Sequence, residues 1–438
     1  MTALAQLPPG QTVDEDASRW IEEDPFAAYT HYRAALGDPF TLYRPGKPPR
    51  VFLSDPATIR ELLLSRDRHL EGCGTSLYGK FIGETALPVL VGDEHRRMRQ
   101  LITPTLVGQA LQDRASAIRA TAVEQLRLLR GRPAAPLIDV ASQIATQIVT
   151  PMLFTPSDDA TTARIHTALQ SAMEAVHQAR ALRAAQRMTE AGPWMQRFQQ
   201  HLAELDVVLL QEISRCRATT TATEPTVLAR LIASPEHLTD QQIRDQLVTL
   251  LIGGANTVGS AIAMALYWVR RLPAVAERLT AELAALPQDA SALTVGALPY
   301  LGAICDETLR IGSVTPTASA RKVTTAFTAL GYEFPAGTEL IIAIHLAHRR
   351  EQVFPDSEIF LPERFLGDRP SPTEYLPFGS GTRRCPGAAL TDLEMRLILA
   401  EMVCTSGLEL LGGEIPFQPV SYGASVALPS TVQVRIAG

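Results

Sequence analysis

Apolar residues recur three and four positions apart over much of the chain between residues 56 and 310. This spacing places apolar side chains on one face of a helix, so we predict a mostly helical region there. The stretches with the clearest helical spacing are residues 59–64, 115–129, 160–176, 193–213 and 240–269.

Runs suited to strands lie before and after this region. Polar and apolar positions alternate around Pro45-Gly46, which predicts a strand, a turn and a second strand. Residues 317–342 contain β-like runs, residues 351–380 are rich in Pro, Asp, Gly and Phe and predict an ordered meander, and short strands are expected from Leu408 onward. A length of 438 residues alone would allow about three domains, but no linker or repeat divides the chain. We therefore predict a mainly α fold with small β-sheets, in a single domain over residues 1–438.

The segment Leu247–Val269 has 23 residues without a charge and is long enough to cross a membrane. Its middle contains Gly253, Gly254 and Asn256, and polar groups at bilayer depth are costly. We therefore predict a long helix buried in a protein core. The first residues have neither a basic stretch nor an apolar one, so we expect no signal peptide and no membrane anchor.

Charge and cysteine content narrow the class of protein. The net charge is −6 and the pI is about 5.9, so nothing indicates binding to nucleic acid. The cysteines are odd in number and lack a C-x-x-C spacing, which disfavours a disulfide framework or a zinc site and suits a reducing cytosol. They are Cys73, Cys216, Cys305, Cys385 and Cys404. We therefore predict a cytoplasmic protein.

One decapeptide, residues 378–387, combines a cysteine with turn-forming glycines and reads F-G-S-G-T-R-R-C-P-G. An apolar, helix-like run follows it. The N-terminus of that helix would point at the Cys385 sulfur and favour a thiolate, and Pro386 suits a first helical turn. Gly381 permits a turn with positive φ, and Gly387 lets a flat ring approach the backbone. Each feature fits a thiolate bound to a heme iron.

Two more side chains of the decapeptide fit the same hypothesis. Phe378 can shield the sulfur from water, and Arg383 can pair with a heme propionate. A cysteine alone beside a turn and a helix would be more typical of a buried structural residue. The full combination at this spacing resembles the heme-binding signature of the cytochrome P-450 superfamily, the heme-thiolate monooxygenases, in which the thiolate favours O–O cleavage.

A second motif is Glu307-Thr308-Leu309-Arg310, whose two charged residues share a helix face. A lone pair of this kind is usually exposed on a protein surface. Here Arg364 follows in P-E-R-F, 54 residues after Arg310. The resemblance implies that Glu307, Arg310 and Arg364 form a buried ionic triad behind the heme, which locks the helix and the meander that present the Cys385 loop.

His95 and Arg99 lie four residues apart in G-D-E-H-R-R-M-R-Q and would share a helix face. By themselves they are typical of an ordinary basic helix face. The resemblance implies that both donate to the heme propionates, and that Arg321 is a further donor together with Arg383. Several cations would offset the charge of a buried dianion.

The middle of the long apolar helix reads Gly253-Gly254-Ala255-Asn256-Thr257-Val258. The family pattern here widens the helix into a groove for O₂, with a Thr hydroxyl beside the oxygen and an acid that helps to supply protons. Thr257 matches this pattern, but Asn256 replaces the acid and cannot titrate. We expect proton delivery through Thr257 and water, with lower efficiency or with dependence on the substrate to order that water. The alternative is that Asn256 and Val258 are tolerated core changes.

The resemblance covers roughly residues 90–390 and implies a helical prism, with heme b between the long central helix and the cysteine helix. It also implies that electrons come from a separate ferredoxin or flavodoxin-type donor with its reductase, because no flavin or iron–sulfur segment remains. Four arginines would make a basic face for an acidic partner, or are ordinary solvated residues. They are Arg96, Arg349, Arg350 and Arg384.

The segments that face the substrate in this family are mainly apolar here, with scattered Ser and Thr. They are Leu70–Val91, about Ala168–Trp194, Leu247–Thr257, Gly312–Ala320 and Tyr422–Leu428. A bulky apolar molecule with few oxygens, such as a terpenoid or steroid, suits them best, and fatty acids and polyketides stay open. Two other functions also stay open: a peroxide-using or non-redox heme-thiolate enzyme, and a heme-binding sensor without turnover.

Overall fold

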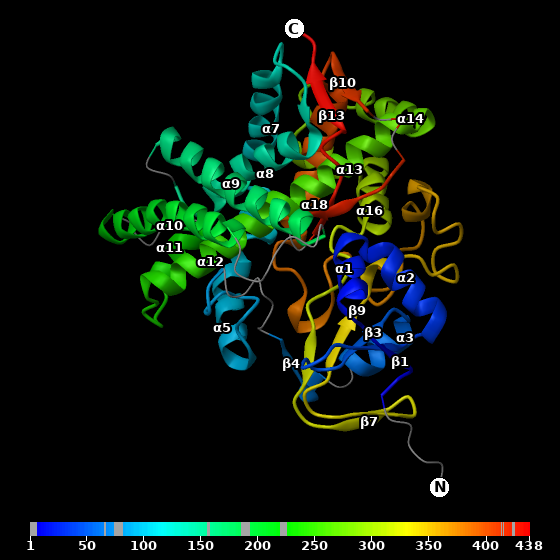
Figure 1. The fold of residues 1–438 in the computed structure, drawn as a ribbon. Helices are drawn as coiled ribbons and strands as arrows, with labels where there is room; N and C mark the ends of the chain where they lie inside the picture. The colour runs from blue at the N-terminus through cyan, green and yellow to red at the C-terminus, as the bar shows by residue number, and fades with distance from the viewer. Residues whose placement is uncertain are drawn as a thin grey trace.

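Helices make up most of the molecule, and the largest β-sheet lies at the end near the N-terminus (Figure 1). The computed structural model describes residues 7–64, 67–73, 82–155, 158–184, 193–219, 226–412, 414, 416–422 and 425–438. The described helices are α1 (Glu15–Glu23), α2 (Pro25–Leu36), α3 (Pro56–Ile59), α5 (Gly92–Ile102), α6 (Gly108–Gln112), α7 (Ala115–Leu129), α8 (Leu137–Leu153), α9 (Asp159–Ala184), α10 (Pro193–Thr219), α11 (Val227–Ile232), α12 (Asp240–Ile252), α13 (Val258–Arg271), α14 (Pro273–Ala284), α15 (Ala292–Gly296), α16 (Pro299–Gly312), α17 (Ile344–Ala347) and α18 (Ala388–Cys404). Each predicted helical stretch lies within helical segments of the structure, so these predictions are confirmed.

The long apolar segment forms one helical rod, which is α12, the π-helical turn η4 (Gly253–Thr257) and α13 in succession. It starts with a capping box, in which Thr239 and Gln242 satisfy each other's backbone N–H groups. Figure 1 shows α13 passing through the middle of the helical body. The rod, Asp240–Arg271, is the one described helix that is long and apolar enough to cross a membrane, and 72% of its most apolar window is buried inside the protein. The prediction of a buried core helix is therefore confirmed.

Helix α8 packs closely against this rod, and two glycines make the approach possible. A β-carbon at Gly254 would lie 2.7 Å from Val149 Cγ2, and one at Gly259 would lie 2.7 Å from backbone atoms of Ser142. Larger residues at these positions would push the two helices apart. This contact fixes the rod along its length and so places η4.

The largest sheet has the strand order β1-β2-β3-β9-β6-β4. Its strands are β1 (Gly10–Thr12), β2 (Phe40–Tyr43), β3 (Arg50–Leu53), β4 (Leu70–Gly72), β6 (Arg321–Val323) and β9 (Glu339–Ile342). The antiparallel pairing of β2 with β3, around Gly46 at φ +67°, confirms the predicted hairpin. Strand β6 carries Arg321 toward the site described below.

Smaller sheets complete the fold. They are β7 (Phe327–Ala329) with β8 (Tyr332–Phe334), β11 (Val420–Tyr422) with β12 (Ser425–Ala427), and β5 (Ala135–Pro136), β13 (Gln433–Ile436) and β10 (Leu408–Leu411). The predicted strands in residues 317–342 and after Leu408 are thus confirmed. Residues 351–380 contain turns and the short helix η5 (Pro362–Phe365), as predicted for a meander.

Candidate active site

A cavity of about 350 Å³ lies between the rod and the segment that carries Cys385. Residues from many parts of the chain line it. They lie in 72–73, 87–106, α8, the rod, 309–320, Ile344, 377–387 and α18. Most of the lining is apolar, with Leu106, Val149 and Leu309 as examples, and the segment after α16 adds Thr315 and Thr317. The predicted substrate-facing segments lie partly outside the described residues, at 74–81, 185–192 and 423–424.

Cys385 is held in the cavity wall by a tight backbone turn. The N–H of Cys385 donates to the Phe378 carbonyl at 2.9 Å, and Gly379 and Gly381 have φ of +69° and +65°. Side chains other than glycine rarely adopt this conformation, so the glycines are needed for the turn. Phe378 and Gly387 also line the cavity beside the sulfur.

The surroundings of Cys385 act on the pKa of its thiol in opposite directions. Burial raises the pKa of the Cys385 thiol, while the Gly387 N–H and the Arg99 and Arg384 guanidinium groups lower it by smaller amounts. The expected effect of the helix N-terminus is therefore present but does not outweigh desolvation. A bound metal cation would supply the missing stabilisation of the thiolate.

Three guanidinium groups and the His95 imidazole, from three segments of the chain, meet near this turn. His95 and Arg99 project from α5 into the cavity, where Arg383 joins them. Arg321 donates to the Ser380 carbonyl at 3.0 Å, in the same turn. Burial and the neighbouring Arg383, Arg99 and Arg321 guanidinium groups together lower the pKa of His95 to about 4, so its imidazole is neutral near pH 7. The structure thus brings together all four predicted residues, three of them cationic, in a place suited to an anionic group.

The π-helical turn η4 forms the opposite wall, as the predicted widening of the helix requires. Gly253, Gly254 and Thr257 line the cavity. The Thr257 hydroxyl donates to the Gly253 carbonyl, so its hydrogen is committed and its oxygen remains able to accept. Asn256 is 6% exposed and is not part of the described cavity lining, and its Nδ2 has no partner among the described residues.

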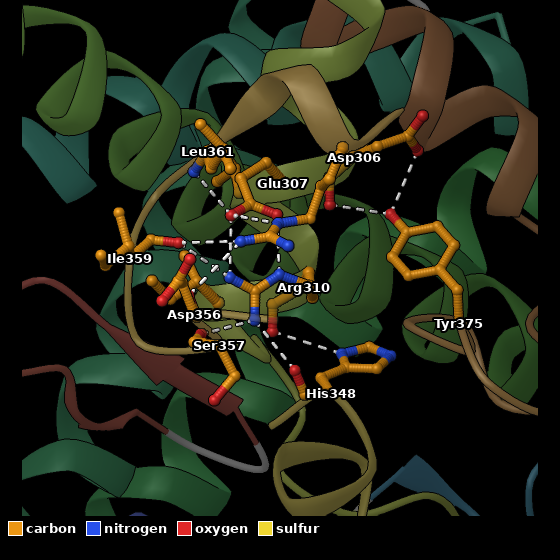
Figure 2. Close-up of polar contacts among 12 residues, drawn as sticks. Asp306, Glu307, Arg310, His348, Asp356, Ser357, Ile359, Leu361 and Tyr375 are labelled. Carbon is orange, nitrogen blue, oxygen red and sulfur yellow. Dashed lines mark hydrogen bonds and ion pairs between the residues drawn. The ribbon is translucent and has the colours of Figure 1, made fainter. Parts of the chain in front are cut away.

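Glu307 and Arg310 of the predicted ionic triad pair with each other (Figure 2), and Arg364 contacts the same carboxylate. Arg310 donates to both Glu307 oxygens, at 2.7 and 2.8 Å, and neither side chain is exposed. Arg364 Nε donates to Glu307 Oε1 at 3.2 Å, and the Leu361 N–H donates to the same oxygen at 2.8 Å. Further bonds run from Arg310 to the carbonyls of His348 and Ser357. These contacts join α16 to the meander.

The predicted basic face is wrong for two of its four arginines. Arg349 pairs with Glu358 and Arg350 pairs with Asp38, and their side chains are only 10% and 21% exposed. Of the others, Arg96 is exposed but bound to Asp93, and Arg384 is exposed. Sequence reasoning failed here because no local pattern links either arginine to its acidic partner. Asp38 is distant in the chain from Arg350, and Glu358 reaches Arg349 only through the turns of the meander.

Sequence reasoning also missed Glu394, whose side chain lines the cavity from α18. It is fully buried, and neither carboxyl oxygen has a hydrogen-bond partner among the described residues. Burial raises the pKa of Glu394 well above its ordinary value, so the neutral acid is favoured. A signal was available, because Leu390, Thr391 and Glu394 follow Gly387 at helical spacing on one face.

A cysteine held in a glycine turn, with three guanidinium groups near it and an apolar cavity in front of it, fits the class of heme-thiolate proteins. Comparison with known proteins agrees: the sequence model of the cytochrome P450 family matches residues 18–428. The chain therefore belongs to the cytochrome P450 family and is a P450 monooxygenase with a heme-iron cofactor.

Relatives of the chain carry matching names. Cytochrome P450 135B1 of Mycobacterium tuberculosis is 32% identical over 392 residues, covering 84% of this chain and 78% of the relative. Cyclooctat-9-en-7-ol 5-monooxygenase of Streptomyces melanosporofaciens is 27% identical over 367 residues, covering 81% and 79%. The structure of retinoic acid-bound cyanobacterial CYP120A1 shares the fold, with a TM-score of 0.84, 19% identity and coverage of 98% and 99%.

The described residues fit a heme by two observations. The cations around His95 form a site for anionic groups such as propionates. The buried Cys385 sulfur opens onto the same cavity, where a metal would hold it as a thiolate.

Proposed function

We propose that the chain is a single-domain monooxygenase that inserts one oxygen atom of O₂ into a bulky apolar small molecule, with heme b held by Cys385. The observation that carries the proposal is the Cys385 sulfur across one cavity from η4. When bound, the heme supplies the reductive activation of O₂. We further propose that Arg99, Arg321 and Arg383 neutralise its propionates and that the neutral His95 imidazole donates a hydrogen bond to one of them, while Phe378, Gly381 and Gly387 shape the loop around the sulfur.

Thr257 and Asn256 have different roles in this proposal. Because the Thr257 hydroxyl donates to the Gly253 carbonyl, its oxygen accepts a hydrogen bond from a water in the groove and so orients that water. Asn256 can orient water but cannot release a proton, so proton supply depends on water held beside Thr257. Glu307, Arg310 and Arg364 act at a distance, because they lock α16 to the meander that leads into the Cys385 loop.

The substrate class follows from the lining of the cavity. Its walls are mainly apolar, and Thr315, Thr317 and Ser319 add a few hydroxyls. This favours a terpenoid or steroid over a small acid. The Streptomyces relative is named for an unsaturated alcohol, cyclooctat-9-en-7-ol, which supports the same class. The protein is expected in the cytoplasm, where a separate ferredoxin or flavodoxin-type donor and its reductase supply electrons.

The test is the absorbance spectrum of the reduced protein with carbon monoxide. The wild-type protein should show the red-shifted Soret band of a thiolate-ligated heme, and Cys385→His should lose it while retaining some heme. Cys404→Ser, at an exposed cysteine, is the control and should keep the band. Survival of the band in Cys385→His would refute the assignment. A screen of terpenoids, steroids and fatty acids for spin-state shifts then identifies the substrate class.

One observation favours a second candidate, a heme-thiolate enzyme that uses peroxide. Asn256 lacks the titratable group that reductive O₂ activation is expected to need. Product formed with peroxide alone, at a rate above that with reduced electron donors, would support this alternative.

A further inference from the structure

Three consecutive side chains on α12 bind the segment that precedes α5. Arg244, Asp245 and Gln246 are 5%, 1% and 0% exposed, although all three are polar. Buried polar groups of this kind must be paired, because an unpaired one is costly. Their partners lie in residues 82–87, about 160 positions earlier in the chain.

Each of the three side chains has its own partners in that segment. Asp245 Oδ2 accepts from the Thr85 N–H at 3.1 Å and from the Thr85 hydroxyl at 2.7 Å. Gln246 Oε1 accepts from the Leu87 N–H at 2.9 Å, and the amide nitrogen of the same side chain, Nε2, donates to the Thr85 carbonyl. Arg244 Nη1 donates to the Ile82 carbonyl at 3.1 Å. We call these contacts the α12 clamp.

A glycine makes the clamp possible. Gly83 has φ of +114°, and a β-carbon there would lie 2.0 Å from Asp245 Cγ. The carboxylate therefore occupies the space that a side chain at position 83 would need. Arg244 also binds Asp206 of α10 at 2.6 Å, so the clamp joins three separate segments of the chain.

The clamp acts on the wall of the cavity. Leu87, the last clamped residue, and Pro88 after it line the cavity, and Thr249 and Leu250 line it from the next turn of α12. We propose that Arg244, Asp245 and Gln246 are positioning residues that hold the Leu87 wall in place and thereby determine how tightly the cavity binds bulky ligands. This inference rests on the proposed function only for the use of the cavity as a ligand site.

A wall that is already fixed raises the affinity for a ligand, because no binding free energy is lost in ordering the Leu87 segment. Loosening the clamp should weaken binding of a ligand that touches the wall and spare one that touches only the iron. Bifonazole and imidazole are suitable probes, because both offer a nitrogen to a ferric heme and only the first is bulky. Their affinities are measured from the shift of the Soret band.

The variants form a matched set. Thr85→Val removes the hydroxyl that Asp245 accepts from, Thr85→Ser keeps it, and Gln246→Leu removes the bonds of the amide to Leu87 and Thr85. Asp240→Asn is the control on the same helix, because Asp240 makes an exposed ion pair with Arg217. We expect Thr85→Val and Gln246→Leu to weaken bifonazole binding by about five- to tenfold, from the loss of one or two hydrogen bonds. Imidazole binding, Thr85→Ser and Asp240→Asn should stay within about twofold.

Hydrogen exchange of the Leu87 amide gives a readout that does not depend on heme. It should accelerate about tenfold or more in Gln246→Leu and remain unchanged in Asp240→Asn. If bifonazole and imidazole affinities fall by the same factor, or if Thr85→Val matches Thr85→Ser in both measurements, the proposal is wrong. Absence of any Soret shift in the wild-type protein would instead contradict the proposed function, and the exchange rates would then decide the clamp alone.

Discussion

The ionic network of α16 and the cavity beside η4 are both buried, but their polar atoms are paired to different degrees. In the network, Arg310 donates five hydrogen bonds, and Glu307 accepts from Arg310, Arg364 and the Leu361 N–H. At the cavity, both carboxyl oxygens of Glu394 lack partners among the described residues, as does Nδ2 of the adjoining Asn256.

This difference in hydrogen-bond pairing distinguishes residues that hold the fold together from residues that can pair with a ligand or with water. A fully paired buried network can hold two segments in one geometry, and removing a member leaves charges unpaired. Buried groups without partners cost stability, and beside a cavity they suit a ligand or water that pairs with them. Changes in the network should therefore lower the free energy of unfolding, whereas changes at the cavity should raise it or alter the chemistry.

The largest effect on stability is expected from Arg310→Ala. The change leaves Glu307 buried with only Arg364 and a backbone N–H, so the free energy of unfolding should fall by about 3–5 kcal/mol. Denaturant unfolding and heme content measure the loss. Arg435→Ala, in an exposed pair with Glu409, is the control and should cost less than about 1 kcal/mol. A fully heme-loaded Arg310→Ala protein with an unchanged melting temperature would show that the network does not stabilise the fold.

The network also predicts a dependence of stability on pH. His348 accepts from the Leu376 N–H at 3.0 Å and contacts the Arg310 carbonyl through Nδ1, and burial and the Arg310 charge lower its pKa to about 3. The unfolded chain binds this proton below about pH 6.5 and the folded chain does not, so stability falls as the pH falls from 6.5 toward 3. Between about pH 7.5 and pH 5, His348 alone should remove about 2 kcal/mol.

Denaturant unfolding of the wild type and of His348→Gln at both pH values measures this contribution. The variant should be less stable at pH 7.5, but it should lose about 2 kcal/mol less than the wild type on acidification. His95 and His345 also have lowered pKa values and act in the same direction in both proteins, so the comparison isolates His348. Equal losses in the two proteins would show that His348 is protonated in the folded state.

Replacing an unpaired group at the cavity should change the free energy of unfolding in the opposite direction. Glu394→Met replaces an unpaired buried acid with an apolar side chain of similar length, so the free energy of unfolding should rise by about 1–2 kcal/mol. Glu401→Met on the same helix is the control, because Glu401 pairs with Arg119 at 2.6 Å and its loss should destabilise the protein. Destabilisation by Glu394→Met, measured by denaturant unfolding, would mean that Glu394 has a partner in solution.

The smallest change in stability, and the clearest change in chemistry, is expected at η4. Thr257→Ala should alter the free energy of unfolding by less than about 1 kcal/mol. It should divert most reducing equivalents to peroxide, because the groove loses the hydroxyl oxygen that we propose orients water there. Asn256→Asp should raise the product formed per reduced cofactor, provided that the folded protein tolerates a buried carboxyl group. Product and peroxide are measured for the wild type and both variants, and unchanged coupling in Thr257→Ala would exclude its role.

Local patterns in the sequence identified the secondary structure and the loop around Cys385, and the family resemblance supplied His95, Arg99, Arg321 and Thr257. The helical spacing of residues 240–269 predicts the rod, and the turn-forming glycines of residues 378–387 predict the loop around Cys385. Periodicity and turn chemistry act between neighbours in the chain, so they can be read without a fold. The resemblance to a family extended this to Arg364, which no local pattern links to Glu307.

The tertiary structure decided which polar groups find partners. Arg350 is half-buried and pairs with Asp38, more than 300 positions away, and Glu394 and the α12 clamp are visible only once distant segments meet. Whether a charge is solvated, paired or left unpaired depends on burial and on contacts between distant segments, and no spacing along the chain encodes these. The sequence alone determined the helices, the hairpin and the Cys385 turn, whereas the folded chain decided the electrostatics of the cavity that they enclose.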